Sequence, residues 1–462
     1  MRIVVAGTGY VGLVSGACLA ELGHEVICAD SDDAKIKQLT LGDVPVHEPG
    51  LAELVAKHAG NRLRFTSDLT GHLSSADAIF IAVGTPATAA GKADLSAVFE
   101  VAEQIAPYLA SDSIVVIKST VPVGTAQQLI RSLAEHNPSA KVDVASNPEY
   151  LREGAAISDF LFPDRIIVGT ESNRVRSFFE RLYAPLSQSG VPLVFMANEA
   201  AELTKYAANN YLAMRIAYVN ELADICEAVG ADISEVTNAM GLDHRIGHHY
   251  LSPGPGFGGS CLPKDTRALM ATTRTAGVEF RLGEAIIAAN EFRKQGLVSR
   301  VARAVGGEVA GKRIAVLGLA FKADTDDIRD SAAIPLIRAL LDQGAEVSAY
   351  DPAAMVPAQR VLQGIDWCHD SFEAATGADA AVIVTEWDAF RTLDLRRLAT
   401  VMREPVLVDF RNLFELAEVA AAGLSYVSIG RAAVERLASV SRSAVKANRD
   451  RKPGSAARRL RA

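Results

Sequence analysis

The chain has 462 residues, of which 49% are hydrophobic and 22% are charged, with a net charge of −8 at pH 7. This length exceeds one ordinary core, so we expect two or three domains, and the acidic balance argues against nucleic acid as a partner. No apolar run approaches a membrane span, and the chain opens into a predicted strand without a signal peptide, so the cytoplasm is the expected compartment.

The first predicted element is a short apolar strand over residues 3–6, which leads into the glycine-rich turn Gly-Thr-Gly-Tyr-Val-Gly at 7–12. Gly7 is expected to form the tight turn and Gly9 to admit a pyrophosphate. Gly12 is expected to let the following helix pack closely, with the phosphates at the helix N-terminus. This pattern predicts a dinucleotide site, and a glycine-rich turn without a ligand is the alternative.

A second strand over residues 25–29 ends in Asp30, eighteen residues after the last glycine of the turn. A carboxylate at this position usually binds the ribose hydroxyls of NAD and repels the additional phosphate of NADP. Strand, glycines, helix, strand and acid in this order therefore predict NAD as the cofactor.

Further apolar runs continue this strand and helix alternation to about residue 197. They are typical of buried parallel strands and lie at residues 78–83, 113–117 and 166–168. The loops that follow two of them, 84–86 and 118–125, are expected to border the site, because ligands bind at the carboxyl ends of such strands.

From residue 198 to about residue 230, apolar and small residues recur at helical spacing without proline, which predicts one long helix that bridges domains. Lys205 and Asn209 are four positions apart and therefore share one face of this helix. Both can equally be surface residues.

The loop 256–265, Gly-Phe-Gly-Gly-Ser-Cys-Leu-Pro-Lys-Asp, places a thiol, an ammonium group and a carboxylate within five positions. A nearby cation favours the thiolate, so Cys261 is a candidate nucleophile, and the alternative is a buried cysteine in a turn. The other four cysteines show no metal-type spacing and are predicted to be small core residues: Cys18, Cys28, Cys226 and Cys368.

A second alternation begins at residues 312–322 and lacks the complete glycine triplet. Its other predicted strands lie at 345–351, 381–385 and 405–409, which indicates a second doubly wound sheet. Phosphates or sugars are expected between the two domains, near Lys322, Arg329 and Arg411, unless these bases are ordinary surface charges. The last residues, 442–462, carry eight Lys or Arg and one Asp, and we expect a disordered basic tail.

Taken in order, the motifs resemble the UDP-glucose/GDP-mannose dehydrogenase family over about residues 1–435. The matching segments are 7–12, Ser-Thr-Val-Pro-Val-Gly-Thr at 119–125, Asn-Pro-Glu-Tyr-Leu-Arg-Glu-Gly at 147–154, Glu-Leu-Thr-Lys-Tyr-Ala-Ala-Asn-Asn at 202–210, the Cys261 loop, and 318–331. The resemblance implies an α/β protein with two Rossmann-like doubly wound domains, joined by a long helix that also forms a homodimer interface. The expected segments are an NAD-binding domain at 1–197, a central helical domain at 198–300, a UDP-sugar-binding domain at 311–435 and the tail at 436–462.

The resemblance also implies NAD-dependent oxidation of a nucleotide sugar from alcohol to acid, through a Cys261 thiohemiacetal and thioester with two hydride transfers. Ser260 and Lys264 favour UDP-glucose or GDP-mannose over N-acetylated UDP-sugars. Leu262 also occurs in GDP-mannose enzymes, but the remaining motifs favour UDP-glucose. GDP-mannose stays the alternative substrate.

Carried over by motif, the expected catalytic residues are Cys261, Lys205, Asn209, Asp265, Thr120 and Glu153. The expected cofactor residues are Gly7, Gly9, Val11, Gly12, Asp30, Lys35, Thr85, Thr120, Glu153, Lys264 and Arg329. The expected substrate residues are Tyr150, Leu151, Arg152, Glu153, Lys205, Asn209, Arg245, Tyr250, Gly258, Lys322 and Arg411, with Arg245 reaching a neighbouring subunit. No metal is expected, although His244 and His248 lie one helical turn apart.

Two other readings of the sequence stay open. A non-catalytic, NAD-responsive nucleotide-sugar-binding protein could share the fold, since fold does not determine function. A hydroxyacid dehydrogenase could share the first domain and perform a single two-electron oxidation. The number of NADH molecules formed per substrate distinguishes the enzymes from each other.

Overall fold

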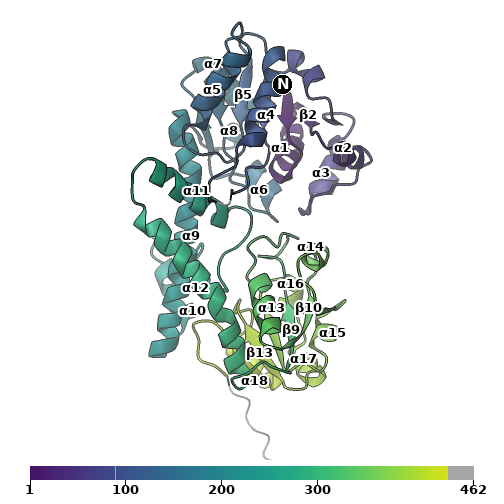
Figure 1. Cartoon of the computed structure of the whole chain (residues 1–462), viewed down its shortest axis with the longest axis vertical. Helices are drawn as coiled ribbons and strands as arrows, with labels where there is room; N and C mark the ends of the chain where they lie inside the picture. Colours follow the sequence, from purple (N-terminus) through teal and green to yellow (C-terminus); the bar gives the residue numbers. More distant parts are fainter. Residues whose placement is uncertain (89, 435–462) are drawn as a thin grey trace, which may run out of the picture.

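The computed structural model describes residues 1–88 and 90–434, so the predicted basic tail at 436–462 lies outside the described residues. Two α/β domains follow one another along the long axis, with α9 (Asn198–Val229) and α12 (Arg281–Ala304) along one side (Figure 1). The prediction of two doubly wound domains joined by a long helix is confirmed. Within the described residues, no helix has the length and apolar character needed to cross a membrane.

The first sheet has eight strands in the order β3-β2-β1-β4-β5-β6-β7-β8. In chain order they are β1 (Arg2–Ala6), β2 (Glu25–Ala29), β3 (Leu63–Thr66), β4 (Ala78–Ile81), β5 (Ile114–Ile117), β6 (Asp143–Ser146), β7 (Ile166–Gly169) and β8 (Leu193–Met196). The run at 166–168 was predicted to be a parallel strand, but β7 pairs antiparallel with β6 and parallel only with β8. The order changes direction between β1 and β4, where a ligand site is expected at the carboxyl ends of the strands.

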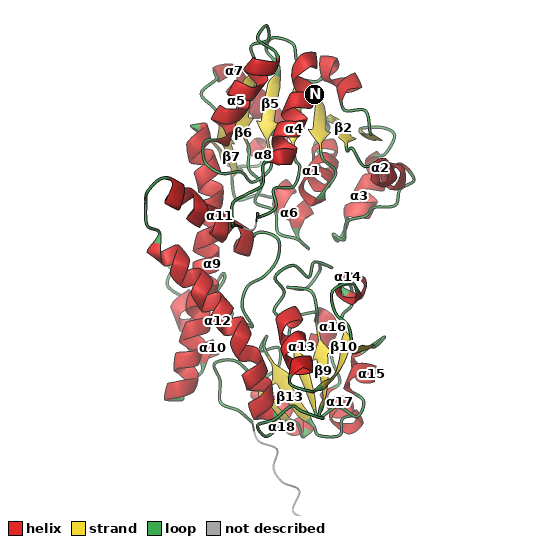
Figure 2. Cartoon of the chain, in the orientation of Figure 1, coloured by secondary structure: helices red, strands yellow, loops and turns green. Residues whose placement is uncertain are grey.

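The central strands of this sheet are buried on both sides, because helices cover both of its faces. On one face the core includes side chains of α1 and α7, and on the other it includes those of α4 and α5. Figure 2 shows these helices around the strands of the first domain. The helices are α1 (Tyr10–Glu21), α2 (Asp33–Thr40), α3 (Leu51–His58), α4 (Ser96–Ile105), α5 (Thr125–His136), α6 (Ala156–Leu161), α7 (Asn173–Leu182) and α8 (Ala184–Gln188), with 3-10 turns η1 (Thr70–Ser75) and η2 (Ala106–Tyr108).

The second sheet has six parallel strands in the order β11-β10-β9-β12-β13-β14. They are β9 (Arg313–Leu317), β10 (Glu346–Tyr350), β11 (Ile365–Trp367), β12 (Ala380–Ile383), β13 (Val406–Asp409) and β14 (Ser425–Val427). Its helices are α13 (Ala333–Asp342), α14 (Met355–Gln359), α15 (Ser371–Ala375), α16 (Asp388–Arg391), α17 (Leu395–Val401) and α18 (Leu416–Ala422).

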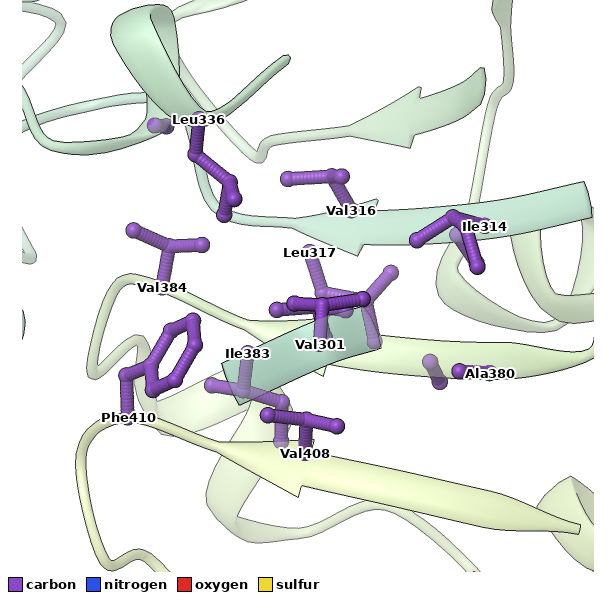
Figure 3. Close-up of a cluster of buried hydrophobic side chains, with 14 of the residues drawn as sticks. Val301, Ile314, Val316, Leu317, Leu336, Ala380, Ile383, Val384, Val408 and Phe410 are labelled. Carbon is purple, nitrogen blue, oxygen red and sulfur yellow. The ribbon is translucent and has the colours of Figure 1, made fainter. Parts of the chain in front are cut away.

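The end of α12 belongs to the core of the second domain. Val301 of this helix belongs to the same buried cluster as Leu317 of β9 and Ile383 of β12, and all three side chains are almost fully buried (Figure 3). Burying one such side chain stabilises the fold by about 1.5–3 kcal/mol. The helix therefore holds the second domain to the central segment, which also contains α10 (Ile233–Gly241) and α11 (Leu262–Thr275).

Candidate active site

Of the three glycines in the turn after β1, one has free space where a side chain would start, and the other two are packed against backbone. Gly7 has φ +102° and lies against β4, where a Cβ atom would come within 2.8 Å of the Ala82 carbonyl oxygen. A Cβ atom on Gly12 would meet the Gly7 carbonyl oxygen at 2.0 Å, whereas one on Gly9 would meet no atom within 4 Å. Gly7 and Gly12 therefore close the turn, and Gly9 borders the space that a pyrophosphate would need.

Asp30 lies beside this turn. Its carboxylate accepts hydrogen bonds from the Thr8 backbone (2.8 Å) and hydroxyl (2.7 Å) and from the Lys35 ammonium group (3.1 Å). Burial opposes ionisation of Asp30, but these hydrogen bonds, with one from Asp32, outweigh it and lower the pKa. Asp30 is thus an anion at the end of β2, suited to accept hydrogen bonds from ribose hydroxyls.

The ends of β4 and β5 are joined next to the same turn. The Thr85 hydroxyl donates to the Thr120 carbonyl oxygen at 2.8 Å, and the Ser119 hydroxyl donates to the Val83 carbonyl oxygen at 2.6 Å. Val11, half-buried in α1, packs against the core on the α1 side of the sheet. The residues predicted to hold NAD in the first domain therefore lie along one edge of the sheet.

Cys261 directly precedes α11 and is half-buried, whereas the other four cysteines are buried, as predicted. Burial raises the pKa of Cys261 to about 11, and the nearby Glu149 and Asp265 carboxylates act in the same direction. Lys205 and a hydrogen bond with Ser260 lower the pKa, but by less. Lys205 therefore favours the Cys261 thiolate, as expected of a nearby cation, but burial outweighs its effect.

Lys205 forms a buried ion pair with Glu149, with Nζ and Oε1 3.2 Å apart. The Lys205 ammonium group also lies over the Tyr150 ring, 5.0 Å from its centre. Burial disfavours the ammonium ion, but Glu149, Cys261 and Asp265 outweigh it and raise the pKa of Lys205. Lys205 is therefore a buried cation near Cys261 and Asp265. Its burial excludes the alternative that Lys205 is a surface residue.

Glu149 was not among the predicted site residues, although it lies in the motif at 147–154. Its pairing with Lys205 depends on the packing of α9 against the loop after β6, which no spacing within that motif reveals. Lys118 was missed in the same way. It is buried at the end of β5 and donates to Asn147 at 3.1 Å, and burial lowers the pKa of Lys118 to about 8.

Asp265 connects α11 to α9. One carboxylate oxygen accepts from the Asn209 amide at 2.6 Å, and the other accepts from the Lys264 ammonium group. Asp265 and Asn209 are both buried. The predicted residues Lys205, Asn209 and Asp265 therefore share one site with Cys261, built from two helices.

Glu153 lies between the thiol and the second domain. It accepts hydrogen bonds from the Ser260 hydroxyl (2.7 Å) and the Thr325 hydroxyl (3.1 Å), and Ser260 Oγ lies 3.4 Å from Cys261 Sγ. Arg329 lies 3.7 Å from the carboxylate. Burial, and then the negative charge of Asp327, raise the pKa of Glu153, a direction that favours the protonated form of this carboxyl group.

The Cys261 loop packs tightly against the second domain. A Cβ atom on Gly258 would meet the Asp330 carbonyl oxygen at 2.4 Å, and the Gly259 N–H donates to the Arg329 carbonyl oxygen at 2.8 Å. Lys322 is half-buried here, and burial lowers its pKa against the influence of Glu153 and Glu386. This packing brings the predicted base Lys322 to the boundary between the domains.

Arg411 also lies at this boundary. Its guanidinium group donates to the carbonyl oxygens of Val384 (2.7 Å) and Phe321 (2.9 Å) and lies 3.0 Å from Glu386. These bonds hold the group at the carboxyl ends of β12 and β13, on the side where the second sheet changes direction.

The remaining predicted substrate residues are Arg152, Tyr250, Leu151 and Arg245, and the first three lie near one another. Arg152 pairs with Asp159 at 2.6 Å, and Tyr250, at φ +60°, is half-buried and lies near Arg152 and Lys205. Leu151 is half-buried beside them and donates its N–H to Glu149. Arg245 is not brought to this site within one chain. Its side chain is 77% exposed and pairs with Asp243.

Histidine, cysteine and carboxylate side chains do not gather in threes at any place suited to a metal in residues 1–88 and 90–434. The candidate His244 is exposed, and its ring lies 3.9 Å from Asp243.

A dinucleotide turn on one doubly wound sheet, a second such sheet, and a thiol with a lysine and carboxylates between them define a nucleotide-dependent dehydrogenase. The chain belongs to the UDP-glucose/GDP-mannose dehydrogenase family. Residues 1–187 match its NAD binding domain, 199–292 its central domain and 315–416 its UDP binding domain. NAD is therefore the cofactor, and the glycine turn and Asp30 fit it.

Known relatives cover almost the whole chain. The UDP-glucose 6-dehydrogenase of Rhizobium meliloti is 50% identical over 435 residues, which cover 93% of this chain and 100% of that protein. The UDP-glucose 6-dehydrogenase of Bacillus subtilis is 44% identical, with 94% of each chain covered. The solved structure of a UDP-glucose dehydrogenase from Pyrobaculum islandicum superposes with a TM-score of 0.86 at 36% identity, covering 93% of this chain and 98% of that one.

Proposed function

We propose that the protein oxidises UDP-glucose to UDP-glucuronate with two NAD, through covalent intermediates on Cys261. The observation that carries this proposal is the position of Cys261, which lies at the start of α11 with Ser260 Oγ 3.4 Å away and with Lys205 and Asp265 acting on its charge. A single two-electron oxidation needs no nucleophile, whereas an alcohol taken to an acid benefits from one that retains the aldehyde.

The chemistry balances with two hydride acceptors and one water. Bound NAD supplies the hydride acceptor in both oxidations. The alcohol loses a hydride and a proton to give an aldehyde, and the Cys261 sulfur then adds to the carbonyl carbon. The thiohemiacetal loses a second hydride and its hydroxyl proton to leave a thioester, and water cleaves the C–S bond to release the carboxylate and a proton and restore the thiol.

The surrounding side chains have complementary tasks in these steps. The Lys205 cation stabilises oxyanions that develop at the sugar carbon, and its ion pair with Glu149 keeps it protonated. Asp265, held by Asn209, assists proton transfer through water. Glu153 has a raised pKa and a hydroxyl link to the thiol, and we assign it to the hydrolytic step.

The deciding experiment counts the NADH formed per sugar with limiting UDP-glucose, GDP-mannose or UDP-N-acetylglucosamine. Two NADH from UDP-glucose alone are expected. Two from GDP-mannose would keep the mechanism and change the substrate. One NADH would remove the thioester step, and none with intact NAD binding would favour the non-catalytic alternative.

We also propose a homodimer that is built on α9. Tyr211, Tyr218 and Ile225 are spaced seven residues apart and are all exposed, so one face of this 32-residue helix presents apolar side chains. Arg215 on the same helix donates to the carbonyl oxygens of Ile246 and Gly247, beside Arg245. A second subunit on this face would put the exposed Arg245 near a neighbouring site.

The cytoplasm is the proposed compartment. Its support is the set of five free cysteines, since thiols persist in reducing compartments.

A further inference from the structure

Helix α9 carries a buried acid, Glu202, three residues before Lys205. Its carboxylate accepts hydrogen bonds from the backbone N–H groups of Gly124 at 2.7 Å and Ala126 at 2.8 Å, at the start of α5. The Ser146 hydroxyl of β6 donates to the same carboxylate at 3.4 Å. One side chain therefore connects α9, α5 and β6.

The segment that Glu202 holds contains Thr120, whose carbonyl oxygen accepts from Thr85. Both threonines lie at the carboxyl ends of strands of the first sheet, the edge where the dinucleotide binds. Gly124 has φ +91°, so the chain turns sharply between Thr120 and α5. Without an acceptor, the N–H groups of Gly124 and Ala126 would be left unpaired at this turn.

We infer that Glu202 is a positioning residue that holds the 120–126 segment against α9, so that the cofactor edge keeps its alignment with Lys205. This inference rests on the proposed function for the identity of the reaction. Glu202 does not touch the reacting atoms. It acts through the backbone of α5 and through its own helix, which also carries the Lys205 cation three residues later.

The same bonds should depend on pH. Burial raises the pKa of Glu202 to about 7, against the hydrogen bonds from Ala126 and Gly124, and Glu199 on α9 acts in the same direction as burial. The other titratable neighbour is Tyr206 on α9, while α5 contributes backbone N–H groups and β6 contributes a hydroxyl. Protonation removes one acceptor oxygen, so the segment is held less firmly as the pH falls through about 7.

Folding stability has the opposite dependence. The pKa of Glu202 in the folded chain lies above its ordinary value of 4.5, so protonation favours the folded state. This contribution is fully present below the ordinary pKa and is lost as the pH rises through about 7. A residue that served stability alone would therefore be better as a neutral amide, whereas a positioning residue needs the carboxylate.

The test measures NADH binding by fluorescence titration of the full chain from about pH 6 to about pH 8. The variants are Glu202→Gln, Glu202→Asp and the matched control Glu135→Gln, which makes the same change at an exposed site near the other end of α5. Wild type should bind NADH more tightly as the pH rises through about 7. Glu202→Gln should bind about tenfold more weakly at pH 8, with no pH dependence in this range, because a charged acceptor is lost.

Glu202→Gln should also unfold no earlier than wild type at pH 8, which separates positioning from a structural role. Glu202→Asp keeps the charge and should retain the pH dependence with weaker binding, and Glu135→Gln should follow wild type. If Glu202→Gln does not fold, the NADH affinity of Glu202→Asp and its pH dependence test the inference instead. Wild-type affinity with a wild-type pH profile in either variant would overturn the inference. Because no sugar is present, failure of UDP-glucose oxidation would leave this result intact.

Discussion

In the proposed mechanism the chemistry depends on the thiol of Cys261, and burial disfavours its nucleophilic thiolate form. With its pKa raised to about 11, it is almost entirely protonated at neutral pH. The same group is flanked by Lys205, which lowers the pKa, and by Glu149 and Asp265, which raise it. The balance of these charges decides how readily the sulfur reacts.

Alkylation should report this balance directly. Below the pKa, the thiolate fraction rises about tenfold per pH unit, so iodoacetamide should label Cys261 faster with rising pH up to about pH 11. Glu149→Gln should speed labelling at pH 8, and Lys205→Met should slow it, because they remove charges of opposite sign. The other four cysteines are buried, and a Cys261→Ser protein gives their background. Equal rates in the two charge variants would contradict the assignment.

Loss of the thiol should separate the two oxidations. Cys261→Ser removes the sulfur that retains the aldehyde, so the second oxidation or the hydrolysis should slow by roughly 100-fold or more. NAD binding should change little, because the glycine turn and Asp30 belong to the first sheet, whereas Cys261 precedes α11. Rapid-quench product analysis and a cofactor titration measure the two effects. Normal overall turnover in Cys261→Ser would exclude the covalent mechanism.

At the scale of elements, the glycines of the turn between β1 and α1 have different roles. Gly7 and Gly12 pack against backbone, whereas Gly9 borders free space. Gly9 has φ −68°, which any residue adopts, and a Cβ atom there meets nothing within 4 Å. Gly12 lies in α1, where a Cβ atom would be 2.0 Å from the Gly7 carbonyl oxygen. The same methyl group should therefore have different effects at the two positions.

We expect Gly9→Ala to fold like wild type and to lose NAD affinity, because its methyl group enters the space for the pyrophosphate. Gly12→Ala should instead lower the free energy of unfolding by about 1–3 kcal/mol or more, because the backbone must move to relieve the clash. Denaturant unfolding and NADH titration on both variants test this pair. Equal free energies of unfolding for the two variants would contradict this prediction, because they would show that the backbone around Gly12 moves to relieve the clash at little cost.

Helix α9 differs in character between its first and later turns. Its first turns carry Glu202, Lys205 and Asn209, which are all buried toward the first domain and the Cys261 loop. Its later turns expose the apolar face of Tyr211, Tyr218 and Ile225. The predicted site residues and the face proposed for the dimer therefore belong to the same helix.

At the scale of the whole molecule, the site lies where the two domains and the central helices meet. Glu153 from the first domain bonds Ser260 of the central segment and Thr325 of the second domain. Glu48 holds the backbone of this loop through the N–H groups of Gly154 and Ala156. The predicted site residues therefore come from parts of the chain that are far apart in sequence.

A charge on the exposed face of α9 should break the proposed dimer. Tyr218→Arg combined with Ile225→Arg places two cations on the apolar face, where a like-charged partner helix would face them in a symmetric dimer. Light scattering should then show a monomer. Leu41→Arg changes another exposed apolar residue, in the first domain, and should leave the dimer unchanged. A dimer of wild-type affinity in the double variant would place the interface elsewhere.

The sequence by itself determined the cofactor turn, the long helix, the two alternations of strands and the Cys261 loop. These features are local: periodicity marks α9 from Asn198, and the glycines at 7, 9 and 12 lie within six residues. Short strands such as β6 and β8 were not predicted, and β7 was given the wrong direction relative to β6, because pairing is set by neighbours distant in the chain.

Tertiary structure decided which charges meet and what they do to one another. Glu149 became a partner of Lys205, and Glu202 became an acceptor for α5, only because α9 packs against the first sheet. The high pKa of Cys261 likewise follows from burial and from carboxylates on other segments. Electrostatic interaction and desolvation depend on distance and dielectric surroundings, and those are properties of the folded chain that residue spacing does not contain.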